Sequence, residues 1–196
     1  MCKYKVIDKH SVFTNIINTS LYTHYEKISK EETHSKRVSE LCEILGEAME
    51  LPEIEISKLR ISGLLHDIGK NAIDEEVLHK SRPLTDEEWN EIKMHPDTGY
   101  RILSWSNEMA EIAQYVLYHH ERFDGLGYPR GLKQEEIPLL SRIISVVDSY
   151  DAMTNHRAYK GTLNKNMAIK ELLINKGKQF DPDIVDIFIE KVLNNQ

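Results

Sequence analysis

The stretch LLSRIISVVDSYDAM, residues 139–153, constrains the fold of this chain more than any other part of the sequence. It has a helical pattern and is so strongly apolar that such a helix has to be buried by the rest of the chain. Asp148 lies within it, and burying an unpaired carboxylate is very costly. The stretch therefore predicts a central helix and a cation or metal ion beside Asp148.

The other regular segments are helical in pattern as well. No run of residues shows the period of two that is typical of strands, whereas at least seven segments show helical spacing or helix-start residues. Between residues 31 and 49, apolar residues recur at steps of three and four and form one buried stripe. Thr85 with Glu88 forms a capping box, and Asp181 before Pro182 is a typical helix start. The sequence predicts an all-α fold.

The length and the composition predict one domain. A chain of 196 residues with 40% hydrophobic residues can bury one sizeable core. Residues 1–30 are rich in Lys, Asn and Thr, and their apolar residues have loosely helical spacing. We expect an N-terminal helical extension at residues 1–30 and a single compact helical domain at residues 31–196.

The charge and the cysteine content exclude several classes of protein. A net charge of −7 argues against general binding of nucleic acid or of an anionic membrane. A membrane-spanning helix needs about 20 consecutive apolar residues, and no stretch of this sequence approaches that length. The N-terminus lacks the apolar region of a signal peptide. Cys2 and Cys42 are too few and too badly spaced for a disulfide framework or a zinc ribbon. We therefore expect a cytoplasmic protein that binds neither nucleic acid nor membrane.

Histidine and aspartate occur together in short motifs. His66 and Asp67 begin HDIGK, His95 begins HPDTG, and His119 and His120 begin HHE. Consecutive helical residues point about 100° apart, which suits a carboxylate at Asp67 that bridges two metals while His66 binds one. Imidazole and carboxylate ligands without cysteine favour Fe, Mn, Co or Zn over a structural zinc.

His34 lies upstream of these motifs. It precedes Val38 by four residues and therefore faces the same way as the buried stripe. A histidine in such a position is more often a hydrogen-bonded core residue than a ligand. Only the other candidate ligands favour a metal role for it.

A glycine-rich loop follows HHE directly. Residues 123–138 include Gly125, Gly127, Gly131 and two prolines. Composition alone favours a tight surface connection between helices. Metal ligands followed at once by a glycine-rich turn indicate instead a helix end where the backbone comes close to a ligand.

In their order along the chain, HDIGK, HPDTG, HHE and DGLGYP resemble the motifs of the HD-GYP family, the metal-dependent phosphodiesterases of cyclic di-GMP. The resemblance runs from about His34 to Asp181 and implies the helical fold of HD phosphohydrolases. It implies two divalent transition metals, with Fe or Mn favoured and Zn, Co or Ni as alternatives. The implied ligands are His34, His66, Asp67 and Asp148 for the first metal, and Asp67, His95, His119 and His120 for the second.

The resemblance also implies a mechanism and substrate contacts. A hydroxide activated by the metals would attack phosphorus, with Asp67 as the bridging ligand and Lys70 beside the substrate phosphate. The family usually has proline where this chain has Ala158, so Arg157 and Lys160 are either phosphate ligands or solvated cations. The implied substrate contacts are Lys70, Tyr128, Arg157 and Lys160, and the implied loop residues are Asp124, Gly125, Gly127, Tyr128 and Pro129.

Three interpretations of the function follow from this resemblance. Hydrolysis of cyclic di-GMP to linear pGpG, with a second step to GMP open, is favoured because DGLGYP separates the family from other HD phosphohydrolases. Hydrolysis of another cyclic dinucleotide, such as cyclic GMP-AMP, uses the same chemistry with another base pocket. The third interpretation is a catalytically quiet signalling module that binds a partner, such as a diguanylate cyclase, through the glycine-rich loop.

The expected number of metals depends on the residue one helical turn before His34. Some family members hold a third metal through a glutamate at that position, where this chain has Lys30. A lysine offers no carboxylate, and its charge repels a cation. Glu31 and Glu32 project differently around the helix. We therefore expect two metals and, by analogy, a linear product.

Local patterns give five further expectations. Gly69 is expected to end the helix that carries His66, and Trp89 to lie on the buried side of the following helix. A helix starting near residue 107 is expected to carry both histidines of HHE. Glu121 is expected to orient an imidazole, and Asp151 either to have a structural role or to hydrogen-bond a metal ligand.

Overall fold

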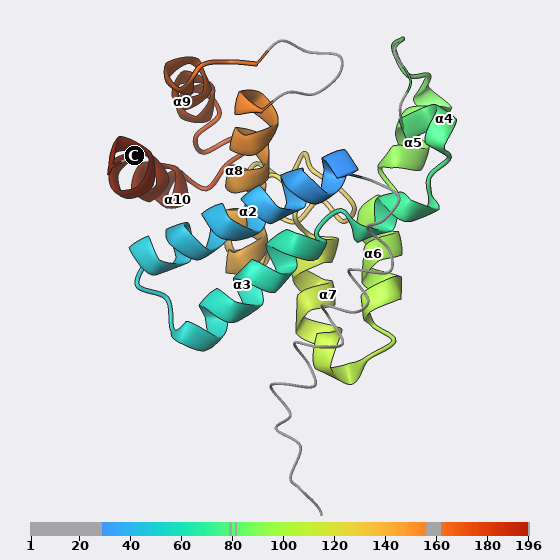
Figure 1. The fold of residues 1–196 in the computed structure, drawn as a ribbon, viewed down its shortest axis with the longest axis horizontal. Coiled ribbons are helices and arrows are strands. Elements are labelled where there is room, and N and C mark those ends of the chain that lie inside the picture. The colour runs from blue at the N-terminus through green and yellow to red at the C-terminus, as the bar shows by residue number, and fades with distance from the viewer. Residues whose placement is uncertain (1–28, 79, 81, 156–161, 196) are drawn as a thin grey trace, which may run out of the picture. The chain divides into compact units, whose positions relative to one another are not determined.

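Figure 1 shows the computed structural model of the chain, which describes residues 29–78, 80, 82–155 and 162–195. The chain separates into two compact units, residues 1–34 and 35–196, and the packing described below is that of the second unit. The predicted N-terminal extension falls outside the described residues except for its last two. The division into an extension and a domain at residue 31 therefore stays a prediction.

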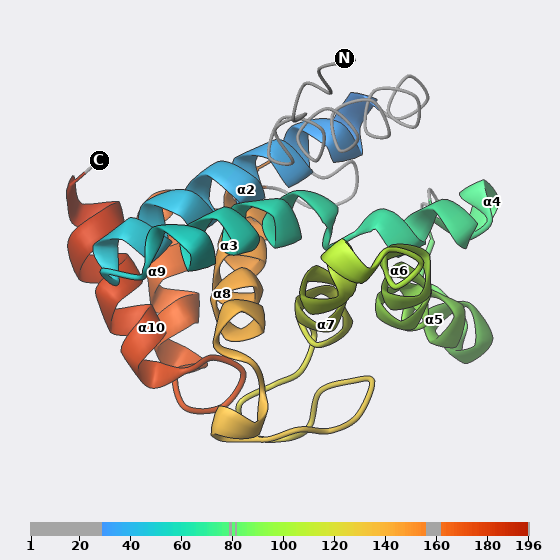
Figure 2. The same cartoon turned by 90° about the horizontal axis from the view of Figure 1, so that it is seen from below.

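The described residues form helices joined by turns and one long loop, and no strand occurs among them (Figures 1 and 2). The predicted all-α fold is confirmed. None of the described helices is both long and apolar enough to cross a membrane. The helices are α2 (Ser29–Ala48), α3 (Glu53–Leu65), α4 (Glu75–Leu78), α5 (Asp86–Ile92), α6 (His95–Leu103), α7 (Ala110–Leu117), α8 (Leu139–Thr154), α9 (Lys165–Ile174) and α10 (Pro182–Ile187), with short turns of helix η1 (Ile68–Ala72), η2 (Asn107–Met109), η3 (Gln134–Glu136), η4 (Phe188–Val192) and η5 (Leu193–Asn195).

The helices are arranged around α8. Both views show α2 beside α3, with α8 passing across them (Figures 1 and 2). The Ser39 hydroxyl of α2 donates to the Arg60 carbonyl of α3 over 2.8 Å, and α8 contacts α3, α7, α9 and α10. The views place α9 and α10 on one side of α8, and α6 and α7 on the other.

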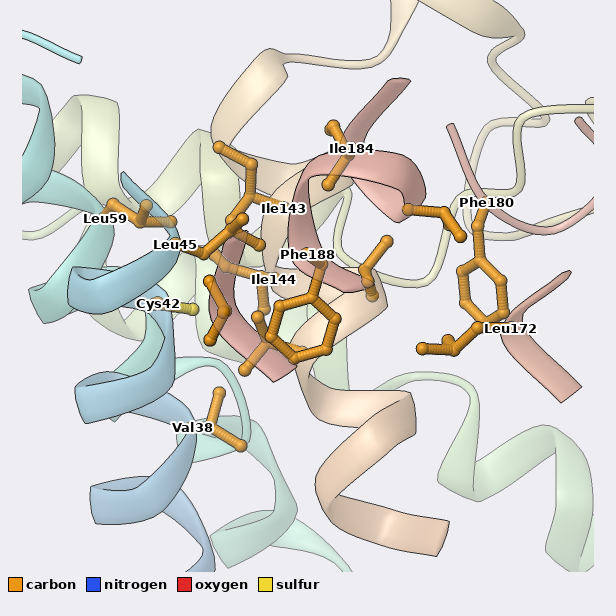
Figure 3. Packing of buried hydrophobic residues seen from close by; sticks show 14 of the residues in the cluster. Val38, Cys42, Leu45, Leu59, Ile143, Ile144, Leu172, Phe180, Ile184 and Phe188 are labelled. Atoms are coloured by element: carbon orange, nitrogen blue, oxygen red, sulfur yellow. The ribbon is translucent and has the colours of Figure 1, made fainter. Parts of the chain in front are cut away.

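The core forms on α8, as its apolar sequence predicts. Figure 3 shows Ile143 and Ile144 of α8 packed between Leu45 of α2 and Phe188, all of them buried. Burying each such side chain stabilises the fold by about 1.5–3 kcal/mol. The Tyr150 ring meets the Phe188 ring edge-on, with centroids 5.3 Å apart. The C-terminal residues are therefore packed into the same core as the central helix.

The most deeply buried carboxylate of α8 is Asp151 and not, as expected, Asp148. The side chain of Asp151 is 1% exposed, and that of Asp148 is 14% exposed. Arg37 of α2 donates to both carboxylate oxygens of Asp151 over 2.6 and 2.8 Å, and the Asn155 amide donates over 2.9 Å. A carboxylate can be buried when it is paired and hydrogen-bonded in this way. The structural role expected for Asp151 agrees with these contacts.

The expectation for Gly69 is wrong. Helix α3 ends at Leu65, and Gly69 lies beyond it within η1. A Cβ atom at Gly69 would lie 2.0 Å from the His95 carbonyl oxygen and 2.7 Å from the Gly99 amide nitrogen. Glycine is therefore required here because η1 and α6 approach each other at backbone distance.

Two helices also differ from the expectations. Trp89 was expected on a buried side of its helix, but it is 45% exposed, and α5 has no fully buried side chain. Helix α7 ends at Leu117, so His119 and His120 follow the helix and do not lie on it. The capping box of Thr85 and Glu88, which opens α5, is present as predicted.

We predict that Gly69→Ala lowers the melting temperature by about 5–10 °C, because overpacking against backbone typically costs about 1–3 kcal/mol. Gly46→Ala is the control, since its added Cβ would meet side chains and not backbone: those of Leu59, Ile56 and Leu51, at 3.2, 3.3 and 3.8 Å. Thermal unfolding followed by circular dichroism measures both variants. An unchanged melting temperature in Gly69→Ala would contradict the close approach of η1 and α6.

Candidate metal centre

Three helix ends position three of the candidate ligands. Helices α3, α5 and α7 each end within three residues before a histidine: His66, His95 and His119. The Nδ1 atoms of these imidazoles lie 2.8, 2.7 and 2.6 Å from the carbonyl oxygens of the residues three positions earlier. Carbonyls in the last turn of a helix lack an intrahelical donor, so each imidazole supplies one.

The end of α5 shows how the sequence produces this arrangement. The carbonyl of Ile92 would accept a helical hydrogen bond from residue 96, but Pro96 has no N–H. The carbonyl instead accepts from His95 Nδ1. His95 is the first residue of α6 and follows the end of α5 by three residues, so it lies at a helix junction.

These hydrogen bonds determine where the ring protons lie. A carbonyl oxygen only accepts, so each Nδ1 carries the proton and each Nε2 keeps its lone pair. The Nε2 atoms of His95 and His119 lie 3.3 Å apart. Two lone pairs cannot bond to each other, whereas a cation between them would satisfy both.

Asp67 lies between two histidines. Its Oδ2 is 3.2 Å from Nε2 of His66, and its Oδ1 is 3.4 Å from Nε2 of His95. Lys70 donates to Oδ2 over 2.6 Å. The two oxygens of one carboxylate therefore face imidazoles that come from different helix ends.

The structure brings most of the predicted ligands together. Asp67, His95, His119 and His120 each offer one ligand atom, and these atoms lie within 4.8 Å of one another. They are the four residues expected at the second metal. The chain therefore contains a group of His and Asp side chains that is able to bind a metal.

The set expected at the first metal is described only in part. Nε2 of His66 lies 3.8 Å from Oδ1 of Asp148 on α8. His34 belongs to the unit 1–34, so its place in this set stays a prediction. Arg157 and Lys160, the expected phosphate contacts, lie outside the described residues.

The electrostatics suit metal ligands. Burial lowers the pKa of His95, lowers that of His119 well below its usual value, and lowers that of His120 to about 3. Burial opposes the ionisation of Asp67, but its interactions with His66 and with the Lys70 ammonium hold its pKa well below the usual range. Neutral imidazoles and an ionised carboxylate are the forms that bind metals, so the residues fit a divalent transition metal.

The glycine-rich loop turns back onto the backbone of HHE. Gly125 has φ +80°, which favours glycine, and a Cβ at Gly127 would lie 2.3 Å from the Arg122 amide nitrogen. Asp124 accepts from the Arg122 guanidinium over 2.7 and 3.1 Å and from the Leu126 amide over 3.0 Å. These contacts agree with the expectation that Asp124 and the glycines fix the shape of the loop.

Glu121 has a different role from the one expected. Its side chain is buried, and its Oε1 accepts from the backbone amides of Arg130 and Gly131 over 2.6 and 3.1 Å. Burial raises the pKa of Glu121, although these amides oppose the shift. The carboxylate therefore holds the far end of the glycine-rich loop and does not orient an imidazole.

Tyr128 lies beside His120, and Lys93 contacts the rings of both Tyr128 and Trp89. The Tyr128 ring lies 5.0 Å from the His120 ring, with an interplanar angle of 31°. Nζ of Lys93 lies 5.9 Å from the centre of the Tyr128 ring and 5.7 Å from that of Trp89. Sequence reasoning did not single out Lys93, although its spacing of four residues from Trp89 places both on one helix face.

Comparisons with known proteins agree with this site. The sequence model of the HD domain family matches residues 12–184. Over 159 residues the chain is 40% identical to a cyclic di-GMP phosphodiesterase of Thermotoga maritima, covering 80% of this chain and 43% of that protein. It is 35% identical over 159 residues to the 3'3'-cGAMP-specific phosphodiesterase 2 of Vibrio cholerae, covering 80% of this chain and 30% of that protein. The chain therefore spans less than half the length of these curated relatives.

A solved structure supports the fold. Bd1817, described as an HDG"Y"P protein from Bdellovibrio bacteriovorus, has a TM-score of 0.66 to this chain at 19% identity, covering 83% of this chain and 52% of that one. Since the family model spans most of the sequence and the motifs converge in space, this chain belongs to the HD domain family and carries the motifs of its HD-GYP branch.

Proposed function

We propose that this chain is a metal-dependent phosphodiesterase that hydrolyses cyclic di-GMP to linear pGpG. The observation that carries the proposal is the position of Asp67, whose two oxygens lie 3.2 and 3.4 Å from the Nε2 atoms of His66 and His95. One carboxylate that presents its oxygens to two groups of imidazoles suits a bridge between two cations. The relative from Thermotoga maritima, named a cyclic di-GMP phosphodiesterase, supports the choice of substrate.

The proposed metals are two divalent transition ions, with Fe or Mn favoured by the mixed imidazole and carboxylate ligands. When bound, such a pair lowers the pKa of water and offsets the charge that develops on the phosphoryl oxygens. The proposed ligands are His34, His66, Asp67 and Asp148 for one ion, and Asp67, His95, His119 and His120 for the other.

The side chains of this protein contribute orientation and charge. The carbonyls at three helix ends hold the imidazoles of His66, His95 and His119 in place, so the ligands need no rearrangement during turnover. Lys70 lies 2.6 Å from Oδ2 of Asp67, and its ammonium would stabilise negative charge on the phosphate that reacts. Tyr128, stacked on His120, would contact the substrate at the edge of the site.

Hydrolysis of a mixed cyclic GMP-AMP dinucleotide is the second candidate. It is favoured by the relative from Vibrio cholerae whose name gives that specificity. The two substrates share their phosphates and differ at one base, so the reacting residues are the same for both. Base-recognising hydrogen bonds decide between them.

A signalling module without catalysis is the third candidate. The glycine-rich loop has an exposed apolar tip, since Leu126 is 79% exposed, and this tip would suit a protein partner such as a diguanylate cyclase. A group of four ligands that converge within 4.8 Å argues against a purely binding role. A docking role for the loop is compatible with catalysis at the neighbouring site.

We predict that metal-reconstituted protein hydrolyses cyclic di-GMP with a kcat/KM about tenfold higher than for 3'3'-cGAMP or cyclic di-AMP, because base-recognising groups unmatched by the wrong base cost about 1–3 kcal/mol. Chromatography of the products should show pGpG first. A higher kcat/KM for 3'3'-cGAMP would establish the second candidate. Absence of turnover with every cyclic dinucleotide, at full metal content, would favour the third.

We predict that Asp67→Ala and His120→Ala each lose bound metal and lower the hydrolysis rate more than about 100-fold. Loss of a residue that only orients a metal ligand typically lowers activity about 10–100-fold, and these two residues are proposed to bind the metal directly. Elemental analysis of the purified protein measures the metal. Asp186→Ala is the control, because Asp186 is 45% exposed and pairs with Lys176 at the surface. Full metal content with undiminished turnover in Asp67→Ala would exclude the bridging role.

The proposed number of metals is two per chain. Helix α2 begins at Ser29, so Lys30, Glu31 and Glu32 all lie in regular helix, and the residue one turn before His34 is the lysine. We predict two peaks per chain in anomalous diffraction above a transition-metal edge. A third peak at full occupancy next to His34 would contradict this number.

A further inference from the structure

Trp89, Lys93 and Tyr128 form a small surface beside the candidate metal centre, called here the lysine–aromatic surface. The Lys93 ammonium lies 5.7 Å from the centre of the Trp89 ring and 5.9 Å from that of Tyr128. Trp89 is 45% exposed, while Lys93 and Tyr128 are half-buried. The Tyr128 ring is in turn 5.0 Å from the ring of His120. The surface thus continues outward from a proposed metal ligand.

The charge of Lys93 is not balanced by a carboxylate in the part of the chain that the structure describes. Two other lysines of the same region have such partners, since Lys70 pairs with Asp67 and Lys80 pairs with Glu88. Within the described residues, the Lys93 ammonium contacts the rings of Trp89 and Tyr128. A cation held between aromatic rings, with no carboxylate beside it, is suited to an external anion.

We propose that the lysine–aromatic surface binds the second nucleotide of the substrate, the one whose phosphate is not attacked. This inference rests on the proposed function. A cyclic dinucleotide carries two phosphates and two bases, and only one phosphate can occupy the place between the metals and Lys70. The other phosphate pairs with Lys93, and its base stacks on the exposed face of Trp89.

The chemistry of the three residues matches these tasks. A lysine binds phosphate by charge-assisted hydrogen bonds, which are stronger than those between neutral groups. A base stacks favourably on an exposed aromatic ring, and this contact tolerates any base. Tyr128 separates the two parts of the site, because its ring contacts His120 and also lies beneath the Lys93 ammonium.

A purely structural role is the alternative explanation. The contact between Lys93 and Trp89 joins positions four residues apart at the end of α5, and such a pair can stabilise the helix without any ligand. That role would change the melting temperature and leave substrate binding unaffected. The two explanations therefore differ in a measurable way.

The first experiment separates the two phosphates by choice of substrate. We expect Lys93→Gln to raise KM for cyclic di-GMP about tenfold and to leave metal content unchanged. Its kcat/KM for bis(p-nitrophenyl) phosphate, which has one phosphate and no base, should stay within about twofold of the wild type. Lys93→Arg should restore most of the affinity, because it keeps the charge. Lys170→Gln, which removes an exposed lysine of α9, is the matched control.

The second experiment uses the tryptophan content of the chain. The protein has two tryptophans, and Trp105 is 92% exposed, so Trp105→Phe leaves Trp89 as the single fluorescent indole at little cost in stability. On rapid mixing with metal-loaded protein, cyclic di-GMP should quench the emission of Trp89 before turnover, whereas inorganic phosphate should not. Adding Lys93→Gln to this variant should shift the midpoint of quenching about tenfold to higher concentration.

The outcomes distinguish this inference from the proposed function. Normal turnover of cyclic di-GMP by Lys93→Gln, together with unchanged Trp89 emission, would overturn the inference and leave the function intact. An equal loss on both substrates would also overturn it, because Lys93 would then act at the reacting phosphate or on the fold. Quenching without turnover in the wild type would overturn the function and support the binding surface. Neither quenching nor turnover would overturn both.

Discussion

The structure depends on keeping an ionised carboxylate, Asp67, inside the protein. An isolated buried carboxylate is strongly destabilising, so positive charge has to reach it from nearby. Gly69 and Lys70, the last two residues of HDIGK, determine the surroundings of this carboxylate. Lys70 turns back within η1 and its ammonium meets Asp67 at 2.6 Å. Gly69 lets α6 approach so closely that Nε2 of the neutral His95 faces the other carboxylate oxygen, where a cation would satisfy both groups. The five residues of HDIGK therefore supply both the buried carboxylate, at Asp67, and the ammonium that balances its charge, at Lys70.

Much of the fold could be predicted from the sequence because it depends on local pattern. The apolar run of α8, the capping box at Thr85 and the start of α10 at Asp181 are properties of neighbouring residues, and each appears in the structure. The spacing of HDIGK likewise indicated that His66 and Asp67 would point apart. The convergence of the remaining ligands could be expected only through the family resemblance, because nothing local relates HPDTG to HHE.

The expectations that were wrong concern contacts between distant residues. Asp148 and Asp151 are equally plausible buried charges in the sequence, and the difference between them is Arg37, which lies 114 residues before Asp151. Gly69 is a plausible helix end until α6 is placed against it. Trp89 occupies an apolar position of its helix, but α5 has too few neighbours to cover it. In the first two cases the deciding partner comes from another part of the chain, and in the third a covering partner is missing among the described residues.

The three helix ends that hold the imidazoles also create an electric field. The C-terminus of a helix carries a partial negative charge, which attracts cations and repels anions within about one turn. Helices α3, α5 and α7 all end beside the same group of ligands, so their fields add to the charge of Asp67. In the proposed function, this field would repel the phosphate of the substrate, and bound cations would offset the repulsion. The helix ends would thus favour an order of binding in which the metals come before the nucleotide.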